Sequence, residues 1–146
     1  MIVRELHVEY RPRPDLPPSG DRALNHPRDV AAFVRPLLEH QAVEVFLVLC
    51  LTTRHRVLSF HELGRGTLSS VTVSPREILQ TALLANAAVV AVAHNHPSGD
   101  PTPSPDDVAL TTRLVQAGEI VGIQVVDHLI VGEAGRYYSF SEGGRL

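Results

Sequence analysis

The stretch from residue 89 to residue 107, VVAVAHNHPSGDPTPSPDD, constrains this chain more than any other. It begins with five small or branched apolar residues, which is typical of a strand that is buried on both faces. This strand ends in the tripeptide HNH, with His94 and His96 two residues apart. Because side chains two apart lie on the same face of a strand, the two imidazoles can converge on one point.

A stiff loop follows this strand and leads into a helix. The loop has Gly99 as its one permissive hinge and is otherwise restrained by Pro97, Pro101 and Pro103. The segment SPDD then has the pattern of a helix N-terminus, with Ser104 at the N-cap, proline at the first helical position and Asp107 three residues after the cap. Two histidines and one aspartate are thereby held close together, and these are three ligands of the kind that a catalytic zinc uses while one position stays open.

Each half of this pattern also has an ordinary structural explanation. His94 and His96 are acceptable residues at a strand end, and Ser104 with Asp107 forms a capping box. Both halves fall within 14 residues and are joined by a rigid loop, which favours a metal site over either explanation alone. The Ser104 hydroxyl either caps the helix or faces a substrate, and we expect a metal-bound Asp107 to have less freedom to reach back to the cap amide.

The spacing His94-x-His96, seven residues, Ser104, two residues, Asp107 resembles the JAMM (MPN-plus) metalloprotease motif. The longer string HNHPSGDPTPS, with REILQTALLANAA before it and DHLIVG after it, resembles the RadC family of JAB-domain proteins, and the resemblance runs from about residue 44 to residue 141. It implies that His94, His96 and Asp107 bind one Zn²⁺. It also implies that Ser104 stabilises a developing oxyanion and that an upstream glutamate is the general acid and base.

Two glutamates are candidates for that role, and we favour Glu44. Glu44 matches the E-x-F pattern of the family, and it opens an apolar strand predicted over residues 43–52, where an unpaired carboxylate is costly to bury. It either lies in water just outside the sheet or reaches the metal site. Glu62, in the string HELGR, lacks the second histidine of H-E-x-x-H, so we expect it to be a strand-end residue. If Glu44 is the base, the strand that it begins and the strand that the histidines end must run in opposite directions.

The remaining pattern predicts an α/β fold with a mixed, largely antiparallel β-sheet flanked by helices on both faces, an architecture that agrees with the JAB/MPN fold and its cytidine-deaminase-like arrangement. We expect residues 1–146 to be one domain, with residues 1–26 forming an N-terminal strand (2–10) and a proline-rich linker packed on it. Besides the strand that begins at residue 89, the expected elements are a helix from residue 27 kinked or split at Pro36, strands over 43–52, 56–62, 123–131 and 136–141, a turn over 64–67, a helix from 75 to Asn86, and a helix from 105 to near Gly118.

Composition narrows the classes of function. The net charge is −3, and all 13 basic residues are arginines scattered along the chain, so charge gives no support to nucleic-acid binding. The one cysteine, Cys50, rules out an internal disulfide and fits a reducing cytoplasm. A zinc deaminase would need the motifs H-x-E and P-C-x-x-C, and a chain with one cysteine cannot supply the second motif. We see no apolar run of membrane-spanning length and no leader, so we expect a cytoplasmic protein.

These observations lead to one principal hypothesis and two alternatives. The principal hypothesis is a zinc-dependent metallopeptidase or isopeptidase that acts on a protein or peptide. The alternatives are a DNA-repair or recombination accessory module with a non-catalytic JAB domain, and a metal-binding scaffold without turnover. RadC proteins usually carry a helix-hairpin-helix region ahead of the JAB domain, and this chain resembles a short form without it, which weakens a DNA role. Asp127-His128 either supports a metal ligand or satisfies itself at a strand crossing, and we expect the latter.

Overall fold

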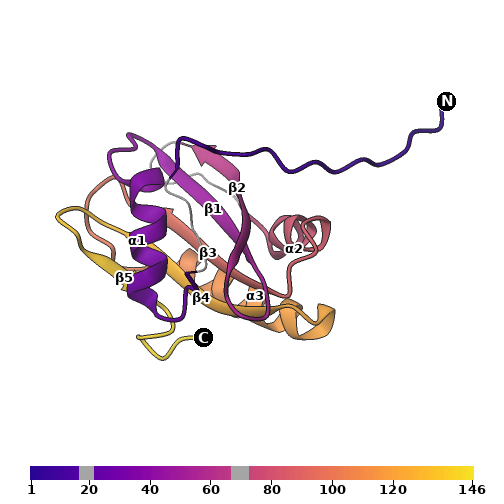
Figure 1. The fold of residues 1–146 in the computed structure, drawn as a ribbon. Coiled ribbons are helices and arrows are strands. Elements are labelled where there is room, and N and C mark those ends of the chain that lie inside the picture. The colour runs from indigo at the N-terminus through magenta and orange to yellow at the C-terminus, as the bar shows by residue number, and fades with distance from the viewer. Residues whose placement is uncertain (17–21, 67–72) are drawn as a thin grey trace.

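The computed structural model describes residues 1–16, 22–66 and 73–146 (Figure 1). Its elements follow in the order α1 (Pro27–Leu38), β1 (Glu44–Leu51), β2 (Val57–Gly66), α2 (Pro75–Leu84), β3 (Val89–Asn95), α3 (Pro105–Val121), β4 (Gln124–Val131) and β5 (Tyr137–Ser139). Each of these elements corresponds to one that the sequence pattern predicts, with differences at the ends.

The strands form one sheet in the order β2-β1-β3-β4-β5. Strand β1 runs antiparallel to both β2 and β3, β4 runs antiparallel to β5, and only β3 and β4 are parallel. The prediction of a mixed, largely antiparallel sheet is therefore confirmed. Phe46 of β1 pairs with His94 of β3, so the strand that Glu44 begins and the strand that carries the histidines do run in opposite directions.

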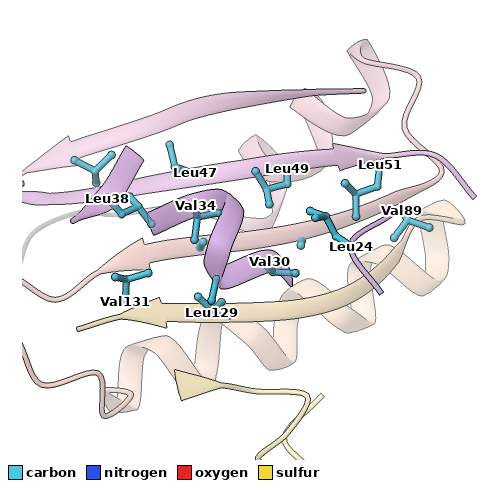
Figure 2. Close-up of a cluster of buried hydrophobic side chains, with 14 residues drawn as sticks. Leu24, Val30, Val34, Leu38, Leu47, Leu49, Leu51, Val89, Leu129 and Val131 are labelled. Carbon is cyan, nitrogen blue, oxygen red and sulfur yellow. The ribbon is translucent and has the colours of Figure 1, made fainter. Parts of the chain in front are cut away.

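Helices cover both faces of the sheet, as expected. Helix α1 lies on one face, where Val30, Val34 and Leu38 are buried against side chains of β1, β3 and β4 (Figure 2). Helices α2 and α3 lie on the other face and pack through Ile78, Ala82 and Leu114. Strand β1 shows the reason for this division, because its alternate residues point to opposite faces. Leu47, Leu49 and Leu51 join the α1 side, and Phe46, Val48 and Cys50 join the other.

The ends of two helices differ from the sequence interpretation. Helix α3 passes through Gly118 and ends at Val121, and its C-cap is Gly122, whose φ of 85° is the left-handed conformation that suits glycine at a helix end. Gly118 serves close packing instead, since a Cβ there would lie 2.5 Å from the Ile123 carbonyl oxygen. Helix α1 continues past Pro36 to Leu38 as one element, so of the two outcomes expected at Pro36, a kink or a split, the split is wrong.

Two further expectations are corrected. Residues 2–10 do not form a strand: the segment is exposed and leads away from the domain (Figure 1), and no described strand pairs with its backbone. Alternation alone does not make a strand, because a strand depends on hydrogen bonds to a neighbour. Gly64 to Gly66 belong to β2 rather than to a turn, since β2 stays paired with β1 up to Gly66 opposite Glu44. Thr67 and the linker residues 17–21 lie outside the described residues.

Within residues 1–16, 22–66 and 73–146, no helix has both the length and the apolar character that crossing a bilayer requires.

Candidate metal centre

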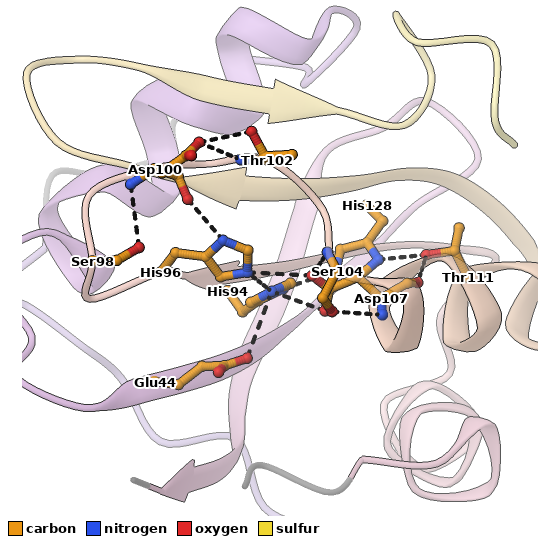
Figure 3. Close-up of polar contacts among 10 residues, drawn as sticks. All are labelled: Glu44, His94, His96, Ser98, Asp100, Thr102, Ser104, Asp107, Thr111 and His128. Carbon is orange, nitrogen blue, oxygen red and sulfur yellow. Dashed lines mark hydrogen bonds and ion pairs between the residues drawn. The ribbon is translucent and has the colours of Figure 1, made fainter. Parts of the chain in front are cut away.

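Four side chains converge at one end of the sheet: Glu44, His94, His96 and Asp107 (Figure 3). His94 is the penultimate residue of β3 and His96 follows that strand directly. Asp107 stands in the first turn of α3, and Glu44 is the first residue of the neighbouring β1. The convergence follows from the topology, because antiparallel pairing places the start of β1 beside the end of β3.

The distances among these side chains fit the coordination of one metal ion. His94 Nε2 lies 3.1 Å from His96 Nε2 and 3.3 Å from Asp107 Oδ1, and His96 Nε2 lies 3.2 Å from Asp107 Oδ2. Ligands at about 2.0–2.1 Å from a tetrahedral zinc are separated from one another by roughly 3.3 Å. Glu44 Oε1 is further out, at 3.6 Å from His94 Nε2. One ligand atom from each of the four residues can be chosen so that all lie within 4.8 Å of one another.

The hydrogen bond behind His96 fixes which of its nitrogens faces the cluster as an acceptor. His96 Nδ1 lies 2.8 Å from the carbonyl oxygen of Asp100. A carbonyl only accepts, so Nδ1 carries the proton and the neutral ring turns the lone pair of Nε2 toward His94 and Asp107. The hydrogen bond to Asp107 raises the pKa of the His96 imidazole, although burial opposes this.

Asp107 caps α3 and faces the histidines at the same time. Its Oδ2 accepts a hydrogen bond from the Ser104 backbone N–H at 2.8 Å, and the same oxygen faces His96. Asp107 thus completes the capping box with the same carboxylate that faces the histidines. Burial alone would raise the pKa of the Asp107 carboxyl, but the neighbouring His94 and His96 rings outweigh it, and the pKa is strongly lowered. Asp107 is an anion throughout the physiological pH range.

Glu44 is partly buried beside the histidines, with its side chain 16% exposed, and so it does not lie free in water outside the sheet. Burial raises the pKa of the Glu44 carboxyl, and the nearby His94 opposes this. The side chain of Asn95 holds the backbone around Glu44: its Oδ1 accepts from the Val45 N–H at 2.7 Å, and its Nδ2 donates to the Val43 carbonyl at 3.0 Å. Sequence reasoning missed this role of Asn95, although the residue stands between the two histidines.

Ser104 lies at the rim of the cluster, and its hydroxyl oxygen accepts the Asp107 backbone N–H at 3.1 Å. This bond uses an oxygen lone pair, so the hydroxyl proton remains a donor. Glu62, the rival candidate for the base, does not belong to the cluster. It is exposed on β2 and forms an ion pair with Arg65.

Two residues behind His94 complete the site. His128 of β4 is fully buried, with its Nε2 2.9 Å from His94 Nδ1 and its Nδ1 2.6 Å from the Thr111 hydroxyl of α3. Burial lowers the pKa of His128 well below its ordinary value, so the ring is neutral. Our expectation for Asp127-His128 is therefore wrong for His128, which contacts a candidate ligand. It holds for Asp127, whose carboxylate accepts bonds from the Ser139 hydroxyl and the Ser141 backbone N–H.

A family model and individual relatives both match this chain over most of its length. Residues 24–145 match the model of the RadC-like JAB domain family. A UPF0758 protein of Symbiobacterium thermophilum is 47% identical over 84% of this chain and 52% of its own length. UPF0758 proteins of Stenotrophomonas maltophilia and Methanosarcina barkeri are 46% and 41% identical over 87% and 84% of this chain, and over 54% and 53% of theirs. This chain thus spans about half the length of the curated relatives it matches, and their names state no activity.

Proposed function

The chain belongs to the family of RadC-like JAB domains, and from that membership we propose that it is a zinc-dependent metallopeptidase or isopeptidase acting on a protein or peptide. The observation that carries the proposal is the convergence of His94, His96 and Asp107 with a nearby, partly buried glutamate. Two imidazoles and one carboxylate form a donor set that suits zinc and leaves a position for water or substrate.

We assign the metal to His94, His96 and Asp107, and the proton transfers to Glu44. Zinc bound there would lower the pKa of its bound water to about 7, so that hydroxide would be available near neutral pH. Glu44 is placed to take the proton of the attacking water and to deliver it to the leaving amine. A partly buried carboxyl with a raised pKa suits this role, since a general acid and base works best when its pKa approaches the working pH.

Ser104 is the proposed donor to the oxyanion that forms when the amide carbonyl is attacked. Its hydroxyl oxygen is fixed by the Asp107 amide, while its proton stays free to donate. A well-placed donor of this kind contributes about 3 kcal/mol to transition-state stabilisation, so Ser104→Ala should lower kcat by about 100-fold.

The test compares Glu44→Gln with Glu62→Gln, an exposed glutamate outside the cluster. Probes are a quenched fluorogenic peptide library and a peptide joined to a lysine side chain through an isopeptide bond. We expect Glu44→Gln to keep its zinc and lose hydrolysis by at least about 100-fold, and Glu62→Gln to behave as the unmodified protein. Loss of zinc from Glu44→Gln would make Glu44 a ligand instead of the base. Salt-sensitive DNA binding that persists after zinc removal would favour the accessory-module hypothesis.

A further inference from the structure

A buried chain of hydrogen bonds links two of the candidate ligands behind the metal centre (Figure 3). It runs from His94 Nδ1 to His128 Nε2 at 2.9 Å, from His128 Nδ1 to Thr111 Oγ1 at 2.6 Å, and from Thr111 Oγ1 to the Asp107 carbonyl oxygen at 2.7 Å. His94, His128 and Thr111 are each completely buried, so water does not compete for these contacts.

The direction of every hydrogen bond in this series follows from its last acceptor, the Asp107 carbonyl oxygen. The Asp107 carbonyl only accepts, so the Thr111 hydroxyl must give its single proton to it. The Thr111 oxygen is then an acceptor, and the proton of the contact with His128 must sit on His128 Nδ1. Burial favours a neutral imidazole, which carries one N–H, so His128 Nε2 is an acceptor as well.

The same reasoning determines which nitrogen of His94 carries the proton. Since His128 Nε2 accepts, His94 Nδ1 donates, and the lone pair of His94 Nε2 is turned toward His96 and Asp107. That is the form of histidine that binds a metal through Nε2. Aromatic rings fix the ring planes: Phe46 stacks on His94 at 5.6 Å between centroids, and Phe140 stacks on His128 at 4.8 Å.

We propose that Thr111 and His128 are positioning residues that hold His94 in its metal-binding tautomer, with the Asp107 carbonyl as the fixed reference. This inference rests on the proposed metal site, but it concerns the protein's affinity for metal and needs no substrate. If the Thr111 hydroxyl is removed, His128 is free to move its proton to Nε2 and donate to His94. His94 would then carry its proton on Nε2, where it opposes the metal.

The test uses two matched pairs of variants. Thr111→Val keeps the shape of the side chain and removes the hydroxyl, whereas Thr111→Ser keeps the hydroxyl. His128→Leu removes both ring contacts, whereas His128→Gln retains one acceptor and one donor. The affinity for Zn²⁺ is measured by competition with a chromophoric chelator, and the Co²⁺-substituted proteins are compared by their visible spectra. The tautomer of His94 is read from ¹⁵N chemical shifts of the metal-free protein.

We expect Thr111→Val and His128→Leu to lose about 10- to 100-fold in zinc affinity and Thr111→Ser to stay within about 3-fold. We expect His128→Gln to bind at least about 3-fold more tightly than His128→Leu, and the ¹⁵N shifts to show His94 protonated on Nδ1 in the unmodified protein and on Nε2 in Thr111→Val. A folded Thr111→Val protein with unchanged zinc affinity and an unchanged His94 tautomer would overturn the inference. If Thr111→Val does not fold, equal zinc affinities of His128→Gln and His128→Leu would overturn it instead. A folded, unmodified protein that binds no metal would overturn the proposed function, which is a distinguishable result.

Discussion

The substitution Asn95→Ala tests how the start of β1 is held beside the candidate metal centre. The Asn95 amide satisfies two backbone groups of the segment that carries Glu44, the Val45 N–H and the Val43 carbonyl. Val45 is buried and Val43 half-buried, so water does not readily replace the lost partners. A buried group that loses its partner costs about 1–3 kcal/mol, and two such groups give an expected loss of about 2–6 kcal/mol in the free energy of unfolding. Chemical denaturation of the metal-free protein measures this loss.

The matched control is Asn25→Ala, which truncates an exposed asparagine and should change the free energy of unfolding by less than about 0.5 kcal/mol. Asn95→Asp adds a second comparison, because a carboxylate still accepts from the Val45 N–H but repels the Val43 carbonyl and the two carboxylates of the cluster. We expect it to be at least as destabilising as Asn95→Ala. If Asn95→Ala unfolded at the same denaturant concentration as the unmodified protein, the reasoning that Asn95 holds this segment would be refuted.

Three further predictions concern the metal affinity, the loop and the core. Zinc affinity should fall as the pH is lowered through the raised pKa of His96, because protons then compete with the metal for His96 Nε2. Above that pKa the zinc affinity should level off. Zinc titrations at several pH values that show no such dependence would refute this prediction. Gly132→Ala should weaken zinc binding and cost about 1–3 kcal/mol in stability, because its Cβ would meet the Gly99 carbonyl oxygen and lie 2.8 Å from Pro101 Cδ, both in the loop between His96 and Ser104. An unchanged melting temperature together with an unchanged zinc affinity would contradict this prediction. Leu38→Ala should lower the free energy of unfolding by about 2–5 kcal/mol, because Leu38, the last residue of α1, is completely buried between that helix and the sheet. Leu83→Ala, at a residue that is 58% exposed, should change it by less than about 0.5 kcal/mol, and equal effects of the two would count against the described core.

The sequence was informative wherever the chemistry depends on local spacing. The pattern from His94 to Asp107 identified three members of the cluster because a strand, a stiff loop and a capped helix bring them together within a short stretch. Glu44 required one further step, the antiparallel pairing of β1 with β3, and the structure confirms that pairing. The roles of these residues in catalysis remain predictions.

The supporting residues were out of reach because their contacts depend on pairing between distant segments. His128 meets His94 only because β4 lies parallel to β3, and Thr111 meets His128 only because α3 packs on β4. The residue patterns of α3 and β4 do not predict these contacts. The opposite error occurred over residues 2–10, where alternation suggested a strand but no described neighbour pairs with the segment.

The most direct test of the central claim is the metal content of protein purified without added zinc, measured by elemental analysis beside the double variant His94→Ala/His96→Ala. The proposed function predicts one equivalent of zinc per chain in the unmodified protein and none in the variant, with both proteins folded. A folded, unmodified protein without metal, or a variant that retains a full equivalent, would contradict the account.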